Sequence, residues 1–399
     1  MTPPMPSTDP TRLPPPGEEA AAWQRRVEER IRAEMEEGGG PLPFRRFMEL
    51  ALYAPGLGYY QAGSEKLGVT GDFVTAPETS PLFGACVAQP VAESLEALGG
   101  GEVLEFGAGS GALAEAVLDS LARWGLLPDR YRILEVSPEL RHRQEQRLRP
   151  LGERLGVEIG WIDALPAAGW RGVVLANEVL DAMPVHRFLR TAGGVEELAV
   201  TLEDGAFAWT TLPASPRLAA AVEALESSLD TPLPPGYRTE LNLEVTPWVG
   251  AIGDFLEAGA VLLLDYGYPR HEYYHPQRSD GTLVCHYRHR AHDDPLILVG
   301  IQDISAFVDF TAVAEAADAA GLRVGGFTSQ AQFMIDAGLP ELLAGLEARP
   351  LMERLRIAEE VKRLTLPGEM GERFKAMLLS RGLERPLRAF RSRQLLGRL

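Results

Sequence analysis

Glu178 and Asp181 are the residues whose types and spacing best suit group-transfer chemistry. They follow a predicted buried strand at 173–176, in the block Asn177-Glu178-Val179-Leu180-Asp181-Ala182-Met183-Pro184. Carboxylates three residues apart project together when the chain begins a helical turn. Such a pair can grip a guanidinium through paired hydrogen bonds and accept its proton as a new bond forms. The alternative is that Asp181 caps a helix and Glu178 is solvated.

A glycine-rich loop, Glu105-Phe106-Gly107-Ala108-Gly109-Ser110-Gly111, separates a predicted strand at 103–106 from a predicted helix at 112–124. Its glycines permit a sharp turn and the close approach of a ligand to the backbone. Glu135 ends the next predicted strand, where a carboxylate can accept both ribose hydroxyls. The two features together predict a nucleotide-like cofactor.

Spacing alone leaves two cofactors open, because Gly107, Gly109 and Ala112 also fit the looser dinucleotide fingerprint of NAD. Glu105 favours S-adenosyl-L-methionine (SAM), since a carboxylate can meet the cationic methionine amine but would repel a pyrophosphate. A third predicted strand, 157–162, ends in Asp163-Ala164, which offers an acceptor to the adenine amino group. These residues favour SAM over NAD.

The elements that position these residues alternate between apolar runs and helical patterns. Strands are predicted at 103–106, 131–136, 157–162, 173–176 and 261–265, and helices at 112–124 and 138–148. This alternation predicts an α/β fold with a doubly wound, Rossmann-like, mostly parallel sheet. Two further predicted strands, 322–327 and 374–380, can pair as an antiparallel edge.

Six segments are expected along the chain. Long, turn-rich stretches within an α/β unit usually cover a site or form a small subdomain. The expected segments are a disordered proline-rich leader at 1–22, an N-terminal helical and lid segment at 23–100 with helices at 23–37 and 43–53, a cofactor-binding core at 101–185, an inserted subdomain at 186–247, the rest of the core at 248–390 with an acceptor loop at 267–300, and a basic tail at 391–399.

Composition narrows the class of partner and the compartment. The 39 Lys+Arg and 56 Asp+Glu give a formal net charge of −17, which argues against binding to nucleic acid or anionic membranes. Cys86 and Cys285 are the two cysteines, too few for a disulfide scaffold. No apolar run is long enough to insert into a membrane. We therefore expect a cytoplasmic protein; its oligomeric state is not predicted.

Three histidines, His286, His289 and His292, are spaced like metal ligands. Their loop also carries arginines and aspartates, which favours hydrogen bonding or acceptor contacts over zinc, and no metal is expected. Cys285 lacks a paired base nearby in the sequence, so a small buried hydrophobic side chain is the better interpretation.

The chain resembles the MidA-like family of SAM-dependent methyltransferases over about residues 41 to 390. The resemblance rests on the glycine loop, the 177–184 block and several further blocks in the same order. These are Ala51-Leu52-Tyr53 with Gly58-Tyr59-Tyr60, Gly71-Asp72-Phe73-Val74-Thr75-Ala76-Pro77-Glu78, Phe83-Gly84, Leu264-Asp265-Tyr266-Gly267, Gly281-Thr282-Leu283, His289, Asp303-Ile304 with Val308-Asp309-Phe310, and Gly371-Glu372-Arg373-Phe374-Lys375.

The resemblance implies a class I methyltransferase fold, SAM as donor, S-adenosyl-homocysteine (SAH) as product, and a protein arginine as acceptor, on a target like a respiratory complex I subunit. It also implies that the segment 71–78 folds over the donor. The expected site residues are Glu178 and Asp181 for catalysis; Glu105, Gly107, Ala108, Gly109, Gly111, Glu135, Val136, Asp163, Ala164, Asn177, Thr75 and Pro77 for the donor; and Asp265, Tyr266 and His289 for the acceptor.

The chain departs from the family pattern in the expected acceptor region, at Val284, Val299 and Ile304-Ser305. These departures bear on which acceptor is used and not on donor binding. Two alternatives therefore stay open beside the protein arginine: a small-molecule acceptor, or a SAM-binding assembly factor that acts by docking with little turnover.

Overall fold

A computed structural model describes residues 13–61 and 75–399. The chain forms two compact units, each built from three separate stretches of sequence. The parallel unit comprises Val74–Leu180, Val245–Gly267 and Phe310–Leu399. The antiparallel unit comprises Met1–Phe73, Asp181–Glu244 and Tyr268–Asp309.

The parallel unit is organised around a sheet with strand order β15-β16-β10-β5-β2-β3-β4. The strands β10, β5, β2, β3 and β4 run parallel, whereas β16 is antiparallel to both β10 and β15. This topology confirms the predicted doubly wound α/β fold and its antiparallel edge. The bounds are β2 Glu102–Phe106, β3 Arg130–Leu134, β4 Glu158–Ile162, β5 Trp170–Asn177, β10 Leu256–Tyr268, β15 Arg323–Ser329 and β16 Phe374–Arg381.

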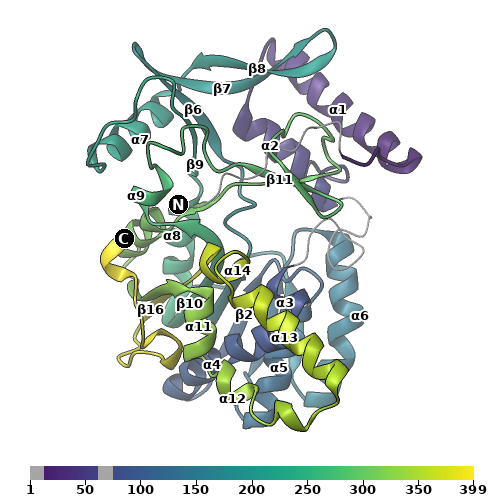
Figure 1. Cartoon of the computed structure of the whole chain (residues 1–399), viewed down its shortest axis with the longest axis vertical. Helices are drawn as coiled ribbons and strands as arrows, with labels where there is room; N and C mark the ends of the chain where they lie inside the picture. Colours follow the sequence, from purple (N-terminus) through teal and green to yellow (C-terminus); the bar gives the residue numbers. More distant parts are fainter. Residues whose placement is uncertain (1–12, 62–74) are drawn as a thin grey trace. The chain divides into compact units, whose positions relative to one another are not determined.

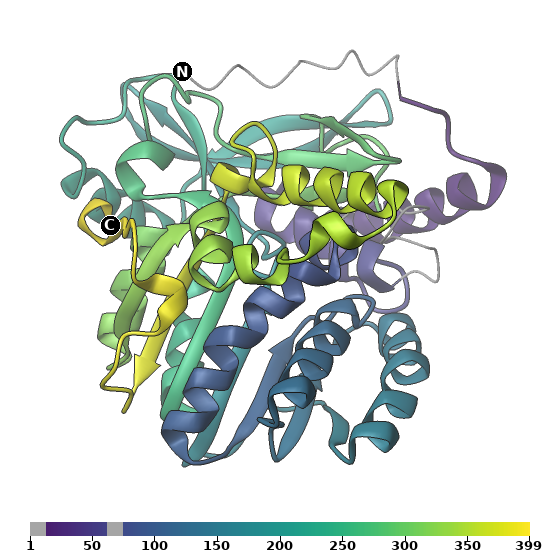
Figure 2. The same ribbon diagram turned by 60° about the horizontal axis from the view of Figure 1, so that its bottom comes forward.

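Helices cover both faces of this sheet (Figures 1 and 2). Side chains alternate along β2, so Val103 packs in the apolar cluster with α4 and α5, whereas the ring of Phe106 contacts Trp248 of α8 at 5.2 Å. The helices of this unit are α3 Ala76–Thr79, α4 Pro81–Leu98, α5 Ala112–Trp124, α6 Pro138–Leu155, α8 Val245–Phe255, α10 Phe310–Ala319, α11 Gln330–Asp336, α12 Leu339–Leu342, α13 Leu351–Thr365 and α14 Met370–Arg373.

The antiparallel unit contains a sheet of order β1-β7-β6-β9, with β8 paired to β7, and a smaller sheet of order β12-β11-β13. Its apolar core joins α1 and α2 to the strands, through Val27, Phe44 and Val200 among others. The bounds are α1 Glu18–Gly38, β1 Leu42–Pro43, α2 Phe44–Tyr53, β6 His186–Thr191, β7 Gly194–Glu203, β8 Ala206–Pro213, α7 Pro216–Ser227, β9 Arg238–Leu241, α9 Arg270–Tyr273, β11 Val284–Tyr287, β12 Arg290–His292 and β13 Asp303–Ser305.

The observed units differ from the predicted segments at several boundaries. Helix α1 begins at Glu18, inside the expected leader, with Glu18 and Glu19 in its first turn, where acids suit the helix dipole. The expected N-terminal segment 23–100 is divided, because α1 and α2 belong to the antiparallel unit and α4 to the parallel unit. The insertion 186–247 and the loop 267–300 supply strands of the antiparallel unit.

The basic tail, expected as a separate segment, is part of the parallel unit. The carbonyl of Arg393 accepts a hydrogen bond from the Thr328 hydroxyl at 3.1 Å, and the side chain of Gln394 accepts one from Phe327 N at 2.9 Å. These bonds occupy backbone and side-chain groups at the outer strand β15. Pairing of this kind covers part of an exposed sheet edge.

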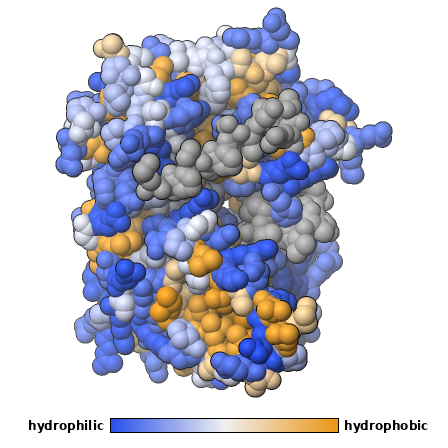
Figure 3. Space-filling view, in the orientation of Figure 1, coloured by the Kyte–Doolittle hydropathy of each residue, from blue (hydrophilic) through white to orange (hydrophobic). Residues whose placement is uncertain are grey.

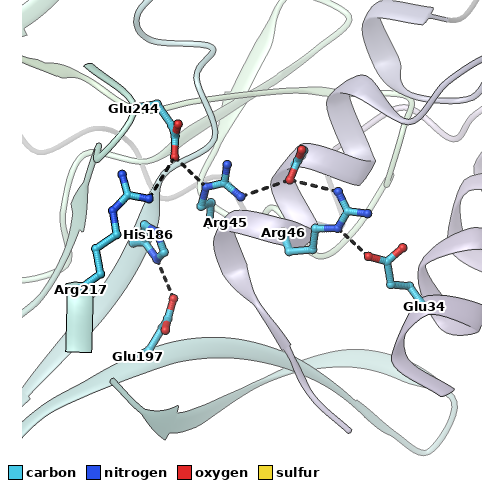
Figure 4. A network of polar contacts seen from close by, with 8 residues as sticks. Glu34, Arg45, Arg46, His186, Glu197, Arg217 and Glu244 are labelled. Carbon is cyan, nitrogen blue, oxygen red and sulfur yellow. Dashed lines mark hydrogen bonds and ion pairs between the residues drawn. The ribbon is translucent and has the colours of Figure 1, made fainter. Parts of the chain in front are cut away.

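A network of ion pairs joins helices within the antiparallel unit (Figure 4). Arg46 bonds Glu34 of α1 at 2.5 Å and Glu49 at 3.1 Å, while Arg45 bonds Glu49 and Glu244, both at 3.2 Å. The side chains are about one-fifth to two-fifths exposed, so each pair contributes little alone. The Arg46–Glu34 pair links α2 to α1, and both helices also pack in the same apolar core.

The face shown in Figure 3 is mostly hydrophilic, with an apolar patch in its lower half. The first turns of α13 supply exposed apolar side chains, since Leu351, Met352 and Leu355 are 64%, 76% and 56% exposed. Within residues 13–61 and 75–399, no helix has both the length and the apolar character needed to cross a membrane.

Candidate functional site

The glycine loop forms the predicted turn between β2 and α5. Gly107, Gly109 and Gly111 have φ values of 59°, 55° and 81°, in the left-handed region that favours glycine. Gly107 N donates to the carbonyl of Leu134 at 3.0 Å, so the loop starts fixed to the end of β3. Helix α5 begins directly after the loop, at Ala112. The loop's backbone therefore lies at the carboxyl ends of β2 and β3, where doubly wound folds bind their ligands.

Glu135 is held beside this loop by Gln144 of α6. One oxygen of Glu135 accepts from Ser137 N at 2.9 Å, and the other accepts from the Gln144 amide at 2.9 Å. The same amide donates to the carbonyl of Gly109 at 2.8 Å, and its oxygen accepts from Trp161 Nε1 at 2.9 Å. Gln144 thus joins the loop, the end of β3 and β4. Sequence reasoning missed it because a lone glutamine within a polar helix carries no motif.

Glu105 lies beneath the loop with its side chain turned into the protein. It is 2% exposed, and its carboxylate accepts a hydrogen bond from the Tyr131 hydroxyl at 2.7 Å. Burial raises the pKa of Glu105 to about 7, an effect that the nearby Glu135 charge strengthens and the Tyr131 hydrogen bond weakens. A direct contact of this carboxylate with the methionine amine stays a prediction.

The buried Glu105 should make stability depend on pH. Its folded pKa of about 7 lies above the reference value of 4.5, so the folded state binds more protons between these values. The free energy of unfolding therefore falls as pH rises through this window, by about 3 kcal/mol from this group. Glu105→Gln should remove that dependence, measured by urea unfolding at pH 5, 6, 7 and 8.

The control for this measurement is Glu158→Gln, because the Glu158 side chain is 71% exposed. It should keep the wild-type dependence of stability on pH. Wild-type and Glu105→Gln curves that run parallel across the range would show that Glu105 is charged in the fold at all these pH values.

The described part of the expected lid lies against the glycine loop. Thr75 precedes α3, Pro77 occupies its first turn, and Glu78 of the same helix accepts a hydrogen bond from the Ser110 hydroxyl. Arg147 of α6 donates to the same hydroxyl at 3.0 Å. The residues 71–74 of the expected lid lie outside the described residues. Thr75–Glu78 is thereby attached to the loop.

The remaining expected donor residues lie around the same strand ends. Val136 follows Glu135 and is 59% exposed, although it is apolar. The Asp163 side chain is 82% exposed and forms an ion pair with Arg141 at 2.8 Å, and Ala164 beside it is exposed. Ala108 is buried within the loop, at 7%. Val136 and Asp163 thus leave surface open to a ligand on the β3–β4 side of the loop.

The segment after β5 does not begin a helix, so the helical turn predicted to carry Glu178 and Asp181 is wrong. Glu178 has φ 53°, a left-handed conformation unusual for a residue other than glycine. Its N–H donates to the carbonyl of Leu264 at 2.9 Å, and Leu180 N donates to Asp265 at 3.0 Å. The backbone therefore bonds to the neighbouring strand β10 instead of to a helical turn, and Asp181 caps no helix.

Asn177 is the last residue of β5, next to this turn. Its amide nitrogen donates to the Glu178 carboxylate at 3.3 Å. Its side-chain oxygen is buried and has no hydrogen-bond partner among the described residues. A buried acceptor in this state is costly, so it suits a site that receives a ligand's donor group.

Asp181 opens the antiparallel unit, so the boundary between the units falls between Leu180 and Asp181. Asp181 is 5% exposed, and its carbonyl accepts a hydrogen bond from Ala306 N at 3.0 Å. The carbonyl of the next residue, Ala182, accepts one from the Tyr53 hydroxyl at 2.9 Å. The predicted catalytic pair is therefore divided between two units, and its joint action stays a prediction.

The expected acceptor residues are also divided. Asp265 is fully buried, and its oxygens accept from Leu180 N and Tyr266 N. The ring of Tyr266 lies 5.2 Å from that of Phe374 in the same unit. His289 is exposed in the antiparallel unit, at the turn between β11 and β12, with φ 59°. Contacts of these three residues with an acceptor stay predictions.

His292, Cys86 and Cys285 are buried, and His286 is partly buried. His292 is 5% exposed, and burial lowers its pKa; His286 Nδ1 lies 3.9 Å from an Asp303 oxygen. Burial raises the pKa of Cys86 to about 12 and that of Cys285 well above its usual value. Over the described ranges, no group of His, Cys, Asp and Glu is arranged to hold a metal ion.

Comparison with known proteins finds a matching family model and several similar chains. Residues 86–328 match the model of a family described as "Putative S-adenosyl-L-methionine-dependent methyltransferase". The chain is 30% identical over 377 residues to the Drosophila melanogaster "Protein arginine methyltransferase NDUFAF7 homolog, mitochondrial", covering 86% of this chain and 82% of that one. The Homo sapiens "Protein arginine methyltransferase NDUFAF7, mitochondrial" is 26% identical over 376 residues, covering 85% and 80%.

A crystal structure from Burkholderia thailandensis, bound to S-adenosyl-homocysteine, is similar over nearly the whole chain. The TM-score is 0.89 and the sequence identity 43%, covering 97% of this chain and 100% of that one. A second structure from the same organism gives a TM-score of 0.87 at 42% identity, covering 97% and 100%.

The expected cytoplasmic location is wrong by this comparison, because the curated relatives are named mitochondrial. The expectation rested on few cysteines and on the lack of an apolar run. Those features indicate a reducing environment and carry no signal that distinguishes one such compartment from another.

Proposed function

Because the chain belongs to the family of S-adenosyl-L-methionine-dependent methyltransferases, we propose that it methylates an arginine side chain of a protein. The observation that carries the acceptor is the set of relatives named protein arginine methyltransferases, at 26% to 30% identity over at least 80% of either chain. The target is a protein like a subunit of respiratory complex I, as the MidA-like resemblance implies. Membership of this family decides between the two candidate cofactors in favour of SAM over NAD.

The residues around the glycine loop fit the donor. Left-handed backbone at Gly107, Gly109 and Gly111 lets a ligand approach the loop without a Cβ in the way. Glu135 offers carboxylate oxygens to ribose hydroxyls, and the exposed apolar Val136 next to it suits the flat face of an adenine. The unsatisfied oxygen of Asn177 suits an ammonium donor, such as the amine of the methionine part.

Glu178 is the group best placed to act on the acceptor. SAM supplies an electrophilic methyl group on a sulfonium, and SAH leaves. A guanidinium is a poor nucleophile because its lone pairs are delocalised and it keeps its proton at neutral pH. Glu178, at the carboxyl end of β5, would localise the positive charge on the far nitrogens, orient the reacting nitrogen and accept its proton as the N–C bond forms. Asp181 would hold the same cation.

Transfer of isotopically labelled methyl groups tests the proposal. The purified protein and labelled SAM are added to an extract of host cells from which the gene has been deleted, and the proteins are then hydrolysed and their amino acids separated. Label should appear in methylated arginine. Asp181→Asn should reduce this label at least about a hundredfold while SAH affinity stays within about threefold, because a neutral amide cannot balance the guanidinium charge.

Asp230→Asn is the matched control, since Asp230 is an exposed acid of the same unit, and it should transfer label as the wild type does. Unchanged turnover in Asp181→Asn would restrict Asp181 to a structural role. Label found only in small molecules would contradict the protein acceptor, and no label despite SAH binding would favour a docking factor.

A further inference from the structure

Asp265 bonds both the end of the turn at 178–180, which follows β5, and the backbone of its own strand β10. It lies near the end of β10 and is completely buried. One carboxylate oxygen accepts from Leu180 N at 3.0 Å, and the other accepts from Tyr266 N at 2.9 Å. Hydrogen bonds to an ionised carboxylate are about twice as strong as neutral ones. Asp265 therefore fixes the end of the turn that carries Glu178.

That turn needs to be fixed, because its backbone is unfavourable. Glu178 has φ 53°, a conformation that costs free energy for a residue with a Cβ and persists where surrounding bonds determine it. The bond from Glu178 N to Leu264 O, at 2.9 Å, secures the start of the turn, and Asp265 secures its end. Strained backbone of this kind gathers at functional sites.

The turn also lies against the donor loop. A Cβ on Gly107 would stand 3.5 Å from Cγ2 of Val179, the residue after Glu178. A shift of the turn would therefore change both the direction of the Glu178 side chain and its packing against the glycine loop.

Lys375 is a second buried charged residue at the level of Asp265. The two residues stand directly opposite each other in the antiparallel β10–β16 ladder, so their side chains project from the same face. Lys375 is 5% exposed, and its ammonium donates to the carbonyls of Glu372 and Arg373. Charges buried to this extent are held in opposite pairs, because a lone one is costly to desolvate.

We infer that Asp265, with Lys375 opposite it, is a positioning residue that holds Glu178 in its left-handed turn beside the donor loop. It acts on the acceptor through Glu178 and does not touch the acceptor itself. This inference rests on the proposed function for the role of Glu178, whereas its structural part is independent of the acceptor.

Hydrogen exchange tests the structural part without any substrate. Asp265→Asn keeps one side-chain oxygen and replaces the other by an NH2 group, which cannot accept a hydrogen bond. The bonds to the backbone N–H groups of Leu180 and Tyr266 are therefore weakened, and the Leu180 amide should exchange at least about tenfold faster. The amides of Leu262 and Leu263 in the same strand should keep their wild-type rates, and SAH affinity should stay within about threefold. An unchanged rate at Leu180 would overturn the inference.

A double-mutant cycle tests the catalytic part. Asp265→Asn should lower kcat about a hundredfold with KM nearly unchanged, the size expected from a misplacement of about 1 Å. In the Glu178→Gln background, Asp265→Asn should lower kcat by less than about threefold, because residues that act through one another are non-additive. Additive losses, or a raised KM with unchanged kcat, would instead make Asp265 an acceptor contact.

Glu93→Gln is the matched control, since the Glu93 carboxylate also accepts a backbone N–H, that of Arg388 at 2.7 Å, away from the turn. It should keep kcat and the Leu180 exchange rate. If Asp265→Asn does not fold, Lys375→Met takes its place, and it should accelerate Leu180 exchange and lower kcat about tenfold. Wild-type protein that methylates no arginine would refute the proposed function, while the exchange rates still decide whether Asp265 holds the turn.

Discussion

Replacing Gly109 by valine is expected to abolish donor binding. Gly109 has φ 55°, and its carbonyl accepts the Gln144 amide at 2.8 Å, so the loop cannot relax without losing its link to Glu135. A β-branched residue in this conformation costs about 1–3 kcal/mol of folding free energy. The side chain would also occupy space needed by the ligand. Isothermal titration with SAH should show a loss of affinity of at least about a hundredfold.

Gly125→Val is the matched control for this variant. Gly125 has φ 70° at the other end of α5, and a Cβ there meets nothing within 4 Å. The two variants share the backbone strain and should lose similar thermal stability, but Gly125→Val should bind SAH as the wild type does. Tight SAH binding by Gly109→Val would refute the assignment of the loop to the donor.

Much of the parallel unit could be predicted because its strands are locally encoded. The helix predicted at 112–124 coincides with α5, and the strand predicted at 157–162 overlaps β4, Glu158–Ile162. The antiparallel edge formed by β16 was also predicted correctly. In these elements, the apolar period and the flanking glycines indicate the same type of secondary structure and similar boundaries.

The antiparallel unit could not be predicted in this way, because its pairing is non-local. Strand β1, Leu42–Pro43, pairs with Val200 and Ala199 of β7, more than 150 residues later. Two residues carry no periodic pattern, and a long turn-rich insertion offers many registers. Sequence reasoning therefore treated 186–247 and 267–300 as separate insertions, whereas they fold with the N-terminal helices.

The candidate site shows the same division between local and distant information. The glycine loop and Glu135 follow from a short motif, and the structure brings them together through Gln144. The turn at Glu178 was expected to be helical, but Glu178 is left-handed. This form depends on hydrogen bonds to β10, such as the bond from Leu180 to Asp265, which lies 85 residues further along the chain. Motifs identify reacting residues, but the partners that hold them come from other strands.

Glu178 should be sensitive to the loss of its charge even when the size of its side chain is preserved. Glu178→Gln keeps the backbone bond to Leu264 and the side chain's length, but removes the negative charge. The neutral amide can neither localise the charge of a guanidinium nor accept its proton. We therefore expect kcat for arginine methylation to fall by about a hundredfold to ten-thousandfold, as for the loss of a general base, with SAH affinity within about threefold.

Single-turnover transfer of labelled methyl groups, with SAH titration on the same samples, measures both quantities. Glu158→Gln should match the wild type in each, because that carboxylate is 71% exposed at the start of β4. Equal losses of SAH affinity and of transfer in Glu178→Gln would place the carboxylate on the donor. A wild-type kcat would mean that the reaction requires no charge at Glu178 and would refute its proposed role.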